Sequence, residues 1–325
     1  MTENKVCMYT PMVTILCITY NQEDYIRQCL DGFIMQQTKF PFQAVVHDDA
    51  STDNTALIIK EYAEKYPHII KPIFEIENQY SKQDGSIGKI MEAHVEGKYV
   101  AFCEGDDYWI DPFKLQKQVD YMESHPECSL VHSGFKYFYQ ESLLYKDCLN
   151  NYNDNLKRDE VLLQILNYNT YRIQTNTTLF RATDYKYVRN SDTFLYKSNY
   201  FLMGDTQLWI GLLTLGKVHY INECTAVYRF HANSVCRQTD IKKQLRFSLS
   251  CAELRIYLLN KLGLKCSNLY RRFLHEYIIL LIKYLSLNYS FEAKFNPFYL
   301  YSCIKLLLYP NFVRKLVLRR MKYVG

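Results

Sequence analysis

The chain has 325 residues, of which 48% are hydrophobic and 22% are charged, and its formal net charge is +5 at pH 7. This composition excludes a disordered chain and is typical of a globular protein with a sizeable core. No uncharged stretch reaches the ~18 to 20 residues that a membrane-spanning helix needs, and eleven cysteines without a CxxC pair argue against a disulfide framework or a zinc site. Because the first residues, MTENKVCMYT, contain no apolar signal segment, we expect a cytoplasmic protein.

The first part of the chain alternates apolar, β-rich runs with amphipathic helical patterns. Helices are predicted after Asn21, after Thr52 or Asp53, over 86–95 and from Pro112. Strands are predicted over 13–18, 42–46, 69–76, 99–103 and 129–135, the third of them at a sheet edge because it contains Pro72. This alternation over about 130 residues predicts a parallel sheet with helices on both faces.

The charge is unevenly distributed along the chain. Residues 236–325 contain 17 Lys and Arg against 4 Asp and Glu, whereas residues 1–235 contain 22 against 30. The apolar residues of the basic part recur at helical spacing. We therefore expect two regions with different partners, with a boundary near residue 235.

Polar motifs follow three of the predicted strands. Thr19-Tyr20-Asn21 follows the first, His47-Asp48-Asp49 the second, and Glu104–Asp107 the strand at 99–103. Ligands of such sheets bind beyond the carboxyl ends of the strands. Three carboxylates within four positions repel one another unless they reach water or a cation. The sequence therefore predicts a ligand site at this edge of the sheet.

Three interpretations of the acidic motif remain open at this point. Asp106 and Asp107 either cap the next helix, or hold a divalent cation on a nucleotide, or form a phosphodiester or nucleic-acid site. The turn after the first strand reads ITYNQED rather than GxGxxG, and no GxxxxGK[ST] occurs, which disfavours a dinucleotide dehydrogenase and a P-loop enzyme. The basic region lacks the pattern of a nucleic-acid-binding module, so we expect no nucleic-acid partner.

Several longer motifs resemble those of the family 2 glycosyltransferases. The segments ITYNQEDYIRQCLDGFIMQQ, VVHDDASTDNT and YVAFCEGDDYWIDPFKLQKQ occur in the family's order, FLMGDTQLW resembles its acceptor-side motif, and YRFHANS its closing motif. The resemblance implies an α/β, Rossmann-like GT-A fold, with a mostly parallel sheet and helices on both faces, plus a C-terminal helical region. It places a glycosyltransferase domain at 1–235, with a nucleotide-sugar half over 10–135 and an acceptor half over 136–235, and a basic helical region at 236–325.

The same resemblance implies roles for residues on the donor side. Tyr20 is expected to stack on the base, Asp49 to bind its ring NH, with Asp48 the less certain member of that pair, and Asp106 to face the ribose or the metal. Asp107 is expected to bind Mg²⁺ or Mn²⁺ on the diphosphate. Glu104 receives no catalytic role.

Three further residues are assigned near the acceptor. Asp205 is expected to be the general base, although a position near a helix N-terminus alone would explain its negative charge. His231 is expected to contact the metal and Arg229 the diphosphate. The alternative for these two is a surface position or a hydrogen-bonded pair.

The resemblance implies a single-displacement, inverting transfer of a sugar from a nucleotide-diphosphate donor, which we expect to be a UDP-sugar. The expected acceptor is a saccharide or a lipid-linked saccharide, and the expected role is cell-surface polysaccharide synthesis. The alternatives are a metal-dependent nucleotidyltransferase and a non-catalytic protein that binds nucleotide sugars or glycans. The basic, apolar segment Phe312–Met321 is interpreted either as a peripheral anchor on anionic membrane at the inner face of the cell membrane or as part of a packed helical bundle.

Overall fold

The computed structural model describes residues 10–82, 84–148, 157–167, 172–198, 200–231, 240–264 and 268–286. These residues belong to two compact units. The first unit is Met1–Asn199 with Gly204–Ala232, and the second is Tyr200–Met203 with Asn233–Gly325.

A nine-stranded sheet forms the centre of the described part of the first unit, with the order β3-β2-β1-β4-β8-β6-β9-β5 and with β7 paired to β6. The strands are β1 (Val13–Thr19), β2 (Phe42–Asp48), β3 (Ile70–Phe74), β4 (Tyr99–Phe102), β5 (Tyr108–Trp109), β6 (Cys128–Tyr139), β7 (Leu144–Cys148), β8 (Leu179–Arg181) and β9 (Lys217–Phe230). The five predicted strands are all present, and β3, which contains Pro72, lies at the edge as predicted.

Pairing changes direction across the sheet. β1 is parallel to β2 and β4, and β2 is parallel to β3. Beyond β4 the sheet is mixed, because β8 is antiparallel to both β4 and β6, β7 to β6, and β5 to β9, whereas β6 and β9 are parallel. The carboxyl ends of β1, β2 and β4 therefore meet at one edge, which brings together the loops that follow them.

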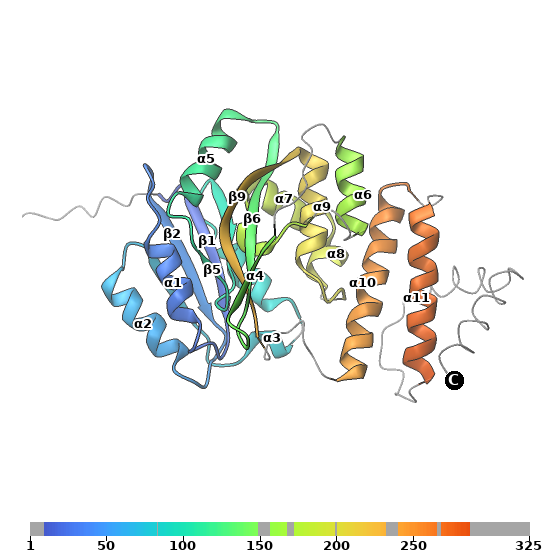
Figure 1. Cartoon of the computed structure of the whole chain (residues 1–325), viewed down its shortest axis with the longest axis horizontal. Coiled ribbons are helices and arrows are strands. Elements are labelled where there is room, and N and C mark those ends of the chain that lie inside the picture. Colours follow the sequence, from blue (N-terminus) through green and yellow to red (C-terminus); the bar gives the residue numbers. More distant parts are fainter. Residues whose placement is uncertain are drawn as a thin grey trace, which may run out of the picture. The chain divides into compact units, whose positions relative to one another are not determined.

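Helices cover both faces of this sheet (Figure 1). The helices of the first unit are α1 (Ile26–Ile34), α2 (Thr55–Lys65), α3 (Gln79–Lys82), α4 (Ser86–Ala93), α5 (Lys114–Ser124), α6 (Arg158–Asn167), α7 (Ala182–Ser191), α8 (Thr193–Lys197) and α9 (Asp205–Leu215), with a 3₁₀ turn η1 at Thr175–Thr177. Successive side chains of a strand point to opposite faces. Tyr99 and Ala101 of β4 accordingly lie in the core beneath α1, α2 and α5, whereas the Phe102 ring packs 6.0 Å from that of Tyr185 on α7 and 6.3 Å from that of Trp209 on α9.

The prediction that Asn21 caps the first helix is wrong. Helix α1 begins at Ile26, and the residue at its N-cap is Tyr25. Asn21 instead has a left-handed backbone (φ 49°), and its Oδ1 accepts a hydrogen bond from Thr52 N at 2.8 Å. Its side chain therefore joins the loops after β1 and β2, a contact between distant segments that local capping patterns do not indicate.

The second unit contains the helices α10 (Ile241–Lys261) and α11 (Asn268–Ser286), which pack on each other. Their presence confirms the predicted C-terminal helices. The buried carboxylate of Glu253 on α10 accepts hydrogen bonds from Tyr277 Oη at 2.9 Å and Tyr200 Oη at 3.3 Å. None of the helices within the described ranges is both long and apolar enough to cross a membrane. The basic segment 312–321 lies outside the described residues.

Candidate active site

The loops after β1, β2 and β4 are tied together by backbone hydrogen bonds at the sheet edge. Asp49 N donates to Thr19 O at 3.0 Å, and Gly105 N donates to Ile18 O at 3.0 Å. These bonds place Tyr20, the Asp48-Asp49 pair and the Glu104–Asp107 motif at the same edge. Tyr20 is 46% exposed, so its ring is accessible there.

Asp107 is held inside the protein. Its side chain is buried, with Oδ1 accepting a hydrogen bond from Arg229 N at 2.8 Å and Oδ2 accepting one from Asn176 Nδ2 at 3.0 Å. Burial, and then the charges of Asp106 and Glu104, raise the pKa of Asp107 well above its usual value. The hydrogen bonds to its two oxygens hold the loop in place.

Asp106 has the opposite character. Its side chain is partly exposed, and its Oδ2 lies 3.0 Å from His231 Nε2. His231 is buried, its ring lies 4.7 Å from that of Tyr25, and its Nδ1 has no hydrogen-bond partner among the described residues. The structure thus brings together two residues that the sequence assigned to the metal region, from segments far apart in the chain.

Arg229 is also committed to internal contacts. Its Nε donates to Asp106 O at 2.8 Å, Nη1 donates to Gln140 Oε1 at 2.6 Å, and Nη2 donates to Gln28 Oε1. The guanidinium is buried against three aromatic rings, those of Tyr25, Tyr108 and Phe138, at 4.8, 5.1 and 5.4 Å. It therefore braces the backbone of the acidic motif with its charge and its hydrogen bonds, and its donors are directed at the protein.

The two carboxylates of the Asp48-Asp49 pair also differ in their hydrogen bonds. Asp49 is buried, and its two oxygens accept hydrogen bonds from Gln79 N at 2.6 Å and Tyr80 N at 3.0 Å, at the start of α3. Asp48 Oδ2 accepts a hydrogen bond from Ser51 N at 3.2 Å, whereas its Oδ1 is buried with no partner in the described part of the chain. An acceptor that is buried without a donor is costly by about 1–3 kcal/mol, which makes this oxygen a candidate for a ligand contact.

Asp205 is the first residue of α9 and is partly exposed. Its Oδ1 accepts hydrogen bonds from Thr206 N at 2.6 Å and Thr206 Oγ1 at 3.3 Å. The surrounding protein raises the pKa of Asp205 by desolvation, and the bonds from Thr206 act against this shift. The carboxylate therefore combines access to solvent with a raised affinity for a proton.

Asp205 is electrostatically linked to the acidic motif. The pKa of Glu104 is raised to about 8 by desolvation, and then by the charges of Asp106 and Asp205. The residue as a whole is nevertheless exposed to solvent. Water reaches this carboxyl group, but protein occupies much of its surroundings. The charge of Asp205 thus acts on Glu104 within the first unit.

The residues present suit a divalent cation in part. A carboxylate is a ligand of both Mg²⁺ and Mn²⁺, and an imidazole is one that Mn²⁺ also accepts; Asp106 with His231 supplies one of each. No group of three or more His, Cys, Asp or Glu side chains that could hold a metal ion occurs in the described ranges. An ion here would need oxygen ligands from a bound substrate as well.

Sequence reasoning missed three residues that support this region. Tyr25 and Gln28 lie within the motif ITYNQEDYIRQ, so that motif contained a signal for them. Asn176 had none. Its side chain is buried, donates to Asp107 Oδ2 and to Val227 O at 2.9 Å, and its backbone oxygen accepts from Trp109 Nε1 at 2.8 Å.

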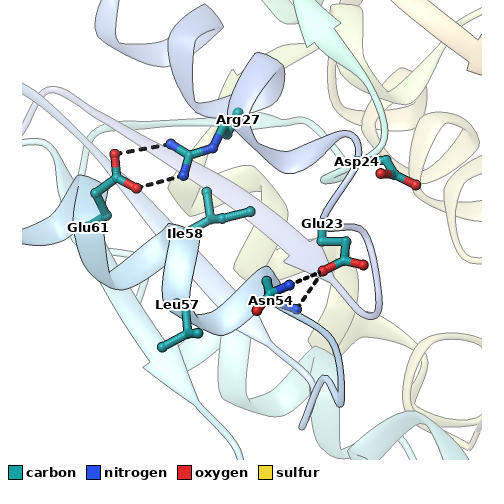
Figure 2. A pocket seen from close by; sticks show the side chains of 7 residues that line it. All are labelled: Glu23, Asp24, Arg27, Asn54, Leu57, Ile58 and Glu61. Carbon is teal, nitrogen blue, oxygen red and sulfur yellow. Dashed lines mark hydrogen bonds and ion pairs between the residues drawn. The ribbon is translucent and has the colours of Figure 1, made fainter.

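A separate pocket of about 560 Å³ lies at the start of α1 and α2 (Figure 2). Arg27 and Glu61 form a two-bond ion pair across it, with distances of 3.0 and 2.7 Å, and Glu23 Oε2 accepts from Asn54 Nδ2 at 2.6 Å. The lining residues are Glu23, Asp24, Arg27, Asn54, Leu57, Ile58 and Glu61. None of the predicted site residues lines this pocket, and Arg27 and Glu61 in its wall bind each other.

Comparison with known proteins gives the family. The model of glycosyl transferase family 2 matches residues 14–192. An uncharacterised protein of Mycobacterium tuberculosis is 35% identical over 226 residues, which are 69% of this chain and 60% of that protein, so the chain spans about three fifths of this relative's length. A Bacillus subtilis protein named as a teichuronic acid biosynthesis glycosyltransferase, TuaG, is 28% identical over 240 residues, covering 70% of this chain and 82% of TuaG.

A solved structure shows the same fold. The mannosyltransferase PcManGT from Pyrobaculum calidifontis, in complex with GDP-Man and Mn²⁺, superposes with a TM-score of 0.51 at 16% identity and covers 95% of this chain and 84% of its own. At that identity the likeness concerns the fold alone. The predicted GT-A fold and family are therefore confirmed, and the chain belongs to glycosyl transferase family 2.

Proposed function

We propose that this chain is an inverting glycosyltransferase that moves a sugar from a nucleotide-diphosphate donor, a UDP-sugar, to a saccharide acceptor. The observation that supports this most directly is geometric: the loops after β1, β2 and β4 meet at one edge of the sheet, where Asp106 Oδ2 lies 3.0 Å from His231 Nε2. A transferase of this kind needs one group that accepts a proton and another that holds the diphosphate, on either side of the reacting carbon. We assign residues 1–235 to this catalytic role.

The base of the nucleotide would lie at the ends of β1 and β2. Tyr20 offers an exposed ring for stacking. We assigned the ring NH to Asp49, but the amides of Gln79 and Tyr80 already bind both oxygens of that side chain. Since Asp48 Oδ1 is buried and lacks a partner in the described residues, we propose that Asp48 supplies the acceptor while Asp49 shapes the loop.

The diphosphate would lie at Asp106 and His231, together with Mg²⁺ or Mn²⁺. Both residues have the chemistry to bind the ion. Asp107 accepts a hydrogen bond on each oxygen and would hold the loop that positions Asp106. When bound, the ion offsets the charge that develops on the departing nucleoside diphosphate by several kcal/mol. Arg229 would act through the loop that it braces, and not through direct contact with the diphosphate.

Asp205 would act as the general base. A sugar hydroxyl is a weak nucleophile at neutral pH, and removal of its proton as the new bond forms contributes typically 10²–10⁴-fold. Desolvation that raises the pKa of this carboxyl makes it a better proton acceptor than an ordinary aspartate. Attack from the face opposite the leaving group inverts the anomeric centre and needs no covalent enzyme intermediate.

For the biological setting, we propose synthesis of a cell-surface polysaccharide on a lipid-linked acceptor. The name of TuaG supports this class of product. Exposed basic residues of α10 and α11, such as Arg246 and Arg271, are available to an anionic membrane surface. Flotation of the chain with anionic vesicles at low salt tests this contact, and failure to float at any salt concentration would contradict it.

Two measurements test the proposed reaction. A thermal-shift screen of UDP- and GDP-sugars with and without Mn²⁺ identifies the donor, because a ligand that binds the folded state raises its melting temperature. Asp205→Asn should then reduce transfer about 10²–10⁴-fold while leaving nucleotide affinity unchanged. Equal loss of nucleotide binding would favour a binding protein without turnover, and transfer of a nucleotidyl group would favour the nucleotidyltransferase alternative.

A further inference from the structure

The outer halves of β6 and β9 present a row of aromatic side chains on one face. In the parallel register Tyr137 lies opposite Tyr228, and Tyr139 lies opposite Phe230. The ring centroids of these pairs are 6.0 and 5.3 Å apart, and all four rings are partly exposed. The intervening residues, among them Arg229, point to the opposite face and are buried. We call these four rings the aromatic face.

Arg172 lies at the edge of the aromatic face. The residue is exposed, its Nη1 donates a hydrogen bond to Tyr137 Oη, and its Cζ lies 5.7 Å from the centroid of the Tyr137 ring. A planar guanidinium held beside a ring is suited to oxyanions, because its donors form a fixed fork that matches carboxylate and phosphate oxygens.

Arg172 also lies within electrostatic range of the proposed base. Desolvation raises the pKa of Asp205, and the charge of Arg172 is among the influences that lower it. The 3₁₀ turn η1, three residues after Arg172, packs against both β6 and β9, and α9, which begins at Asp205, packs against β6. The guanidinium therefore lies against the aromatic face, and its charge reaches the proposed base.

We propose that the aromatic face and Arg172 form the acceptor subsite, and that its ligand is a saccharide that carries an oxyanion, a phosphoryl or carboxyl group, next to the ring stacked on Tyr137. This inference rests on the proposed function and adds to it the chemical class of the acceptor. The apolar face of a pyranose packs on the partly exposed rings, and the oxyanion pairs with Arg172 while the hydroxyl to be glycosylated points toward Asp205.

The test uses the full chain with UDP and Mn²⁺ and follows the binding of small probes by NMR titration. The anionic probes are N-acetylglucosamine 1-phosphate and methyl glucuronide, and their neutral partners are methyl N-acetylglucosaminide and methyl glucoside. We expect either or both anionic probes to bind about tenfold more tightly than their neutral partners, because Arg172 adds a charged hydrogen bond to the oxyanion. The pattern across the probes tells phosphoryl from carboxyl recognition.

Variants assign the preference to particular residues. Arg172→Gln should remove the preference and leave the neutral affinities unchanged, whereas Arg158→Gln, which changes another exposed arginine of the same unit, should keep it. Tyr228→Ala should weaken every probe, and Tyr228→Phe should not. Equal binding of neutral and anionic probes, or a preference that survives in Arg172→Gln, would overturn the proposal.

Nucleotide binding separates this proposal from the one on which it rests. Affinity for UDP in the presence of Mn²⁺ is measured in every variant. If the wild-type chain binds UDP but no anionic probe, the acceptor subsite is wrong and the proposed function stands. If the chain binds neither UDP nor GDP, the proposed function fails first.

Discussion

Asp48-Asp49 at the end of β2 and Asp106-Asp107 after β4 are the same dipeptide at the same edge of the sheet, yet the two members of each pair have different surroundings. Asp49 and Asp107 are buried, and each accepts hydrogen bonds on both oxygens. Asp48 has an oxygen without a partner in the described part of the chain, and Asp106 is partly exposed and faces His231.

The two pairs differ in their backbone. Asp48 is the last residue of β2, whereas Asp106 lies in a turn closed by the bond from Asp107 N to Glu104 O at 3.0 Å. In each pair the second carboxylate accepts from distant segments: the start of α3 for Asp49, and Asn176 and Arg229 N for Asp107. The second member of each pair therefore fixes the loop, whereas Asp106 is partly exposed and Asp48, although buried, keeps one oxygen without a partner in the described residues.

The largest expected effect concerns the inward residue of the second pair. Asp107→Ala removes the acceptor of Asn176 Nδ2 and Arg229 N and leaves the buried guanidinium of Arg229 with less compensation. We expect the free energy of unfolding to fall by about 2–5 kcal/mol, because two buried donors each lose their acceptor at about 1–3 kcal/mol. Urea denaturation measures the loss. The matched variant Asp106→Ala, at a partly exposed position, should lose less than about 1 kcal/mol, and equal losses would mean that the two residues are not divided as described.

For ligand binding we expect the reverse order, with a larger effect from substitution of Asp106 than from substitution of Asp107. We expect Asp106→Ala to abolish most of the increase in UDP affinity that Mn²⁺ causes, a loss of about 10- to 100-fold, because it removes one of two protein groups suited to the ion. Titration of UDP with and without Mn²⁺ gives this ratio. His231→Ala should have a similar effect, and a variant of either residue with an intact Mn²⁺ response would refute this metal assignment.

The first pair extends the comparison with smaller effects. Asp49→Ala deprives two backbone amides of their acceptor and should cost about 1–3 kcal/mol of stability. Asp48→Asn keeps one oxygen that can accept from Ser51 N and should cost less than about 1 kcal/mol of stability. It should weaken UDP binding about tenfold, the loss of one charged contact. Denaturation and UDP titration of both variants decide the matter. If Asp49→Asn weakens UDP binding at unchanged stability while Asp48→Asn does not, the base contact belongs to Asp49.

The sequence was sufficient to predict the strands up to β4, because their apolar runs and the intervening helices have clear periods. It also predicted that three loops meet at one edge, since this follows from parallel pairing alone. The division within each pair was not predictable in this way. The donors to Asp107 lie on η1 and β9, and the donors to Asp49 lie on a four-residue helix, so that no local pattern around the dipeptides indicates which carboxylate is engaged.

Arg229 and the antiparallel strands illustrate a second limit. A lone arginine before a histidine in a motif suggested a ligand contact, but its aromatic surroundings come from Tyr25, Tyr108 and Phe138, which are separated widely in the chain. β5 and β8 contain two and three residues, too few to show an alternation. Features built from short or distant segments need the coordinates.

The smallest expected effect separates carboxylates that take part in the reaction from those that only fix the loops. Only a residue that exchanges a proton during transfer should leave its pKa in the pH profile, so the rate should fall as the pH falls through the raised pKa of Asp205. Because the hydrogen bond from Thr206 Oγ1 lowers this pKa, Thr206→Val should move the acid limb to higher pH, whereas Thr206→Ser keeps the hydroxyl and should not. Rates of transfer across pH for the three proteins measure the shift. An acid limb that stays in place in Thr206→Val would mean that the proton acceptor is another group, and Glu104, whose pKa is raised to about 8, would then be the next to test.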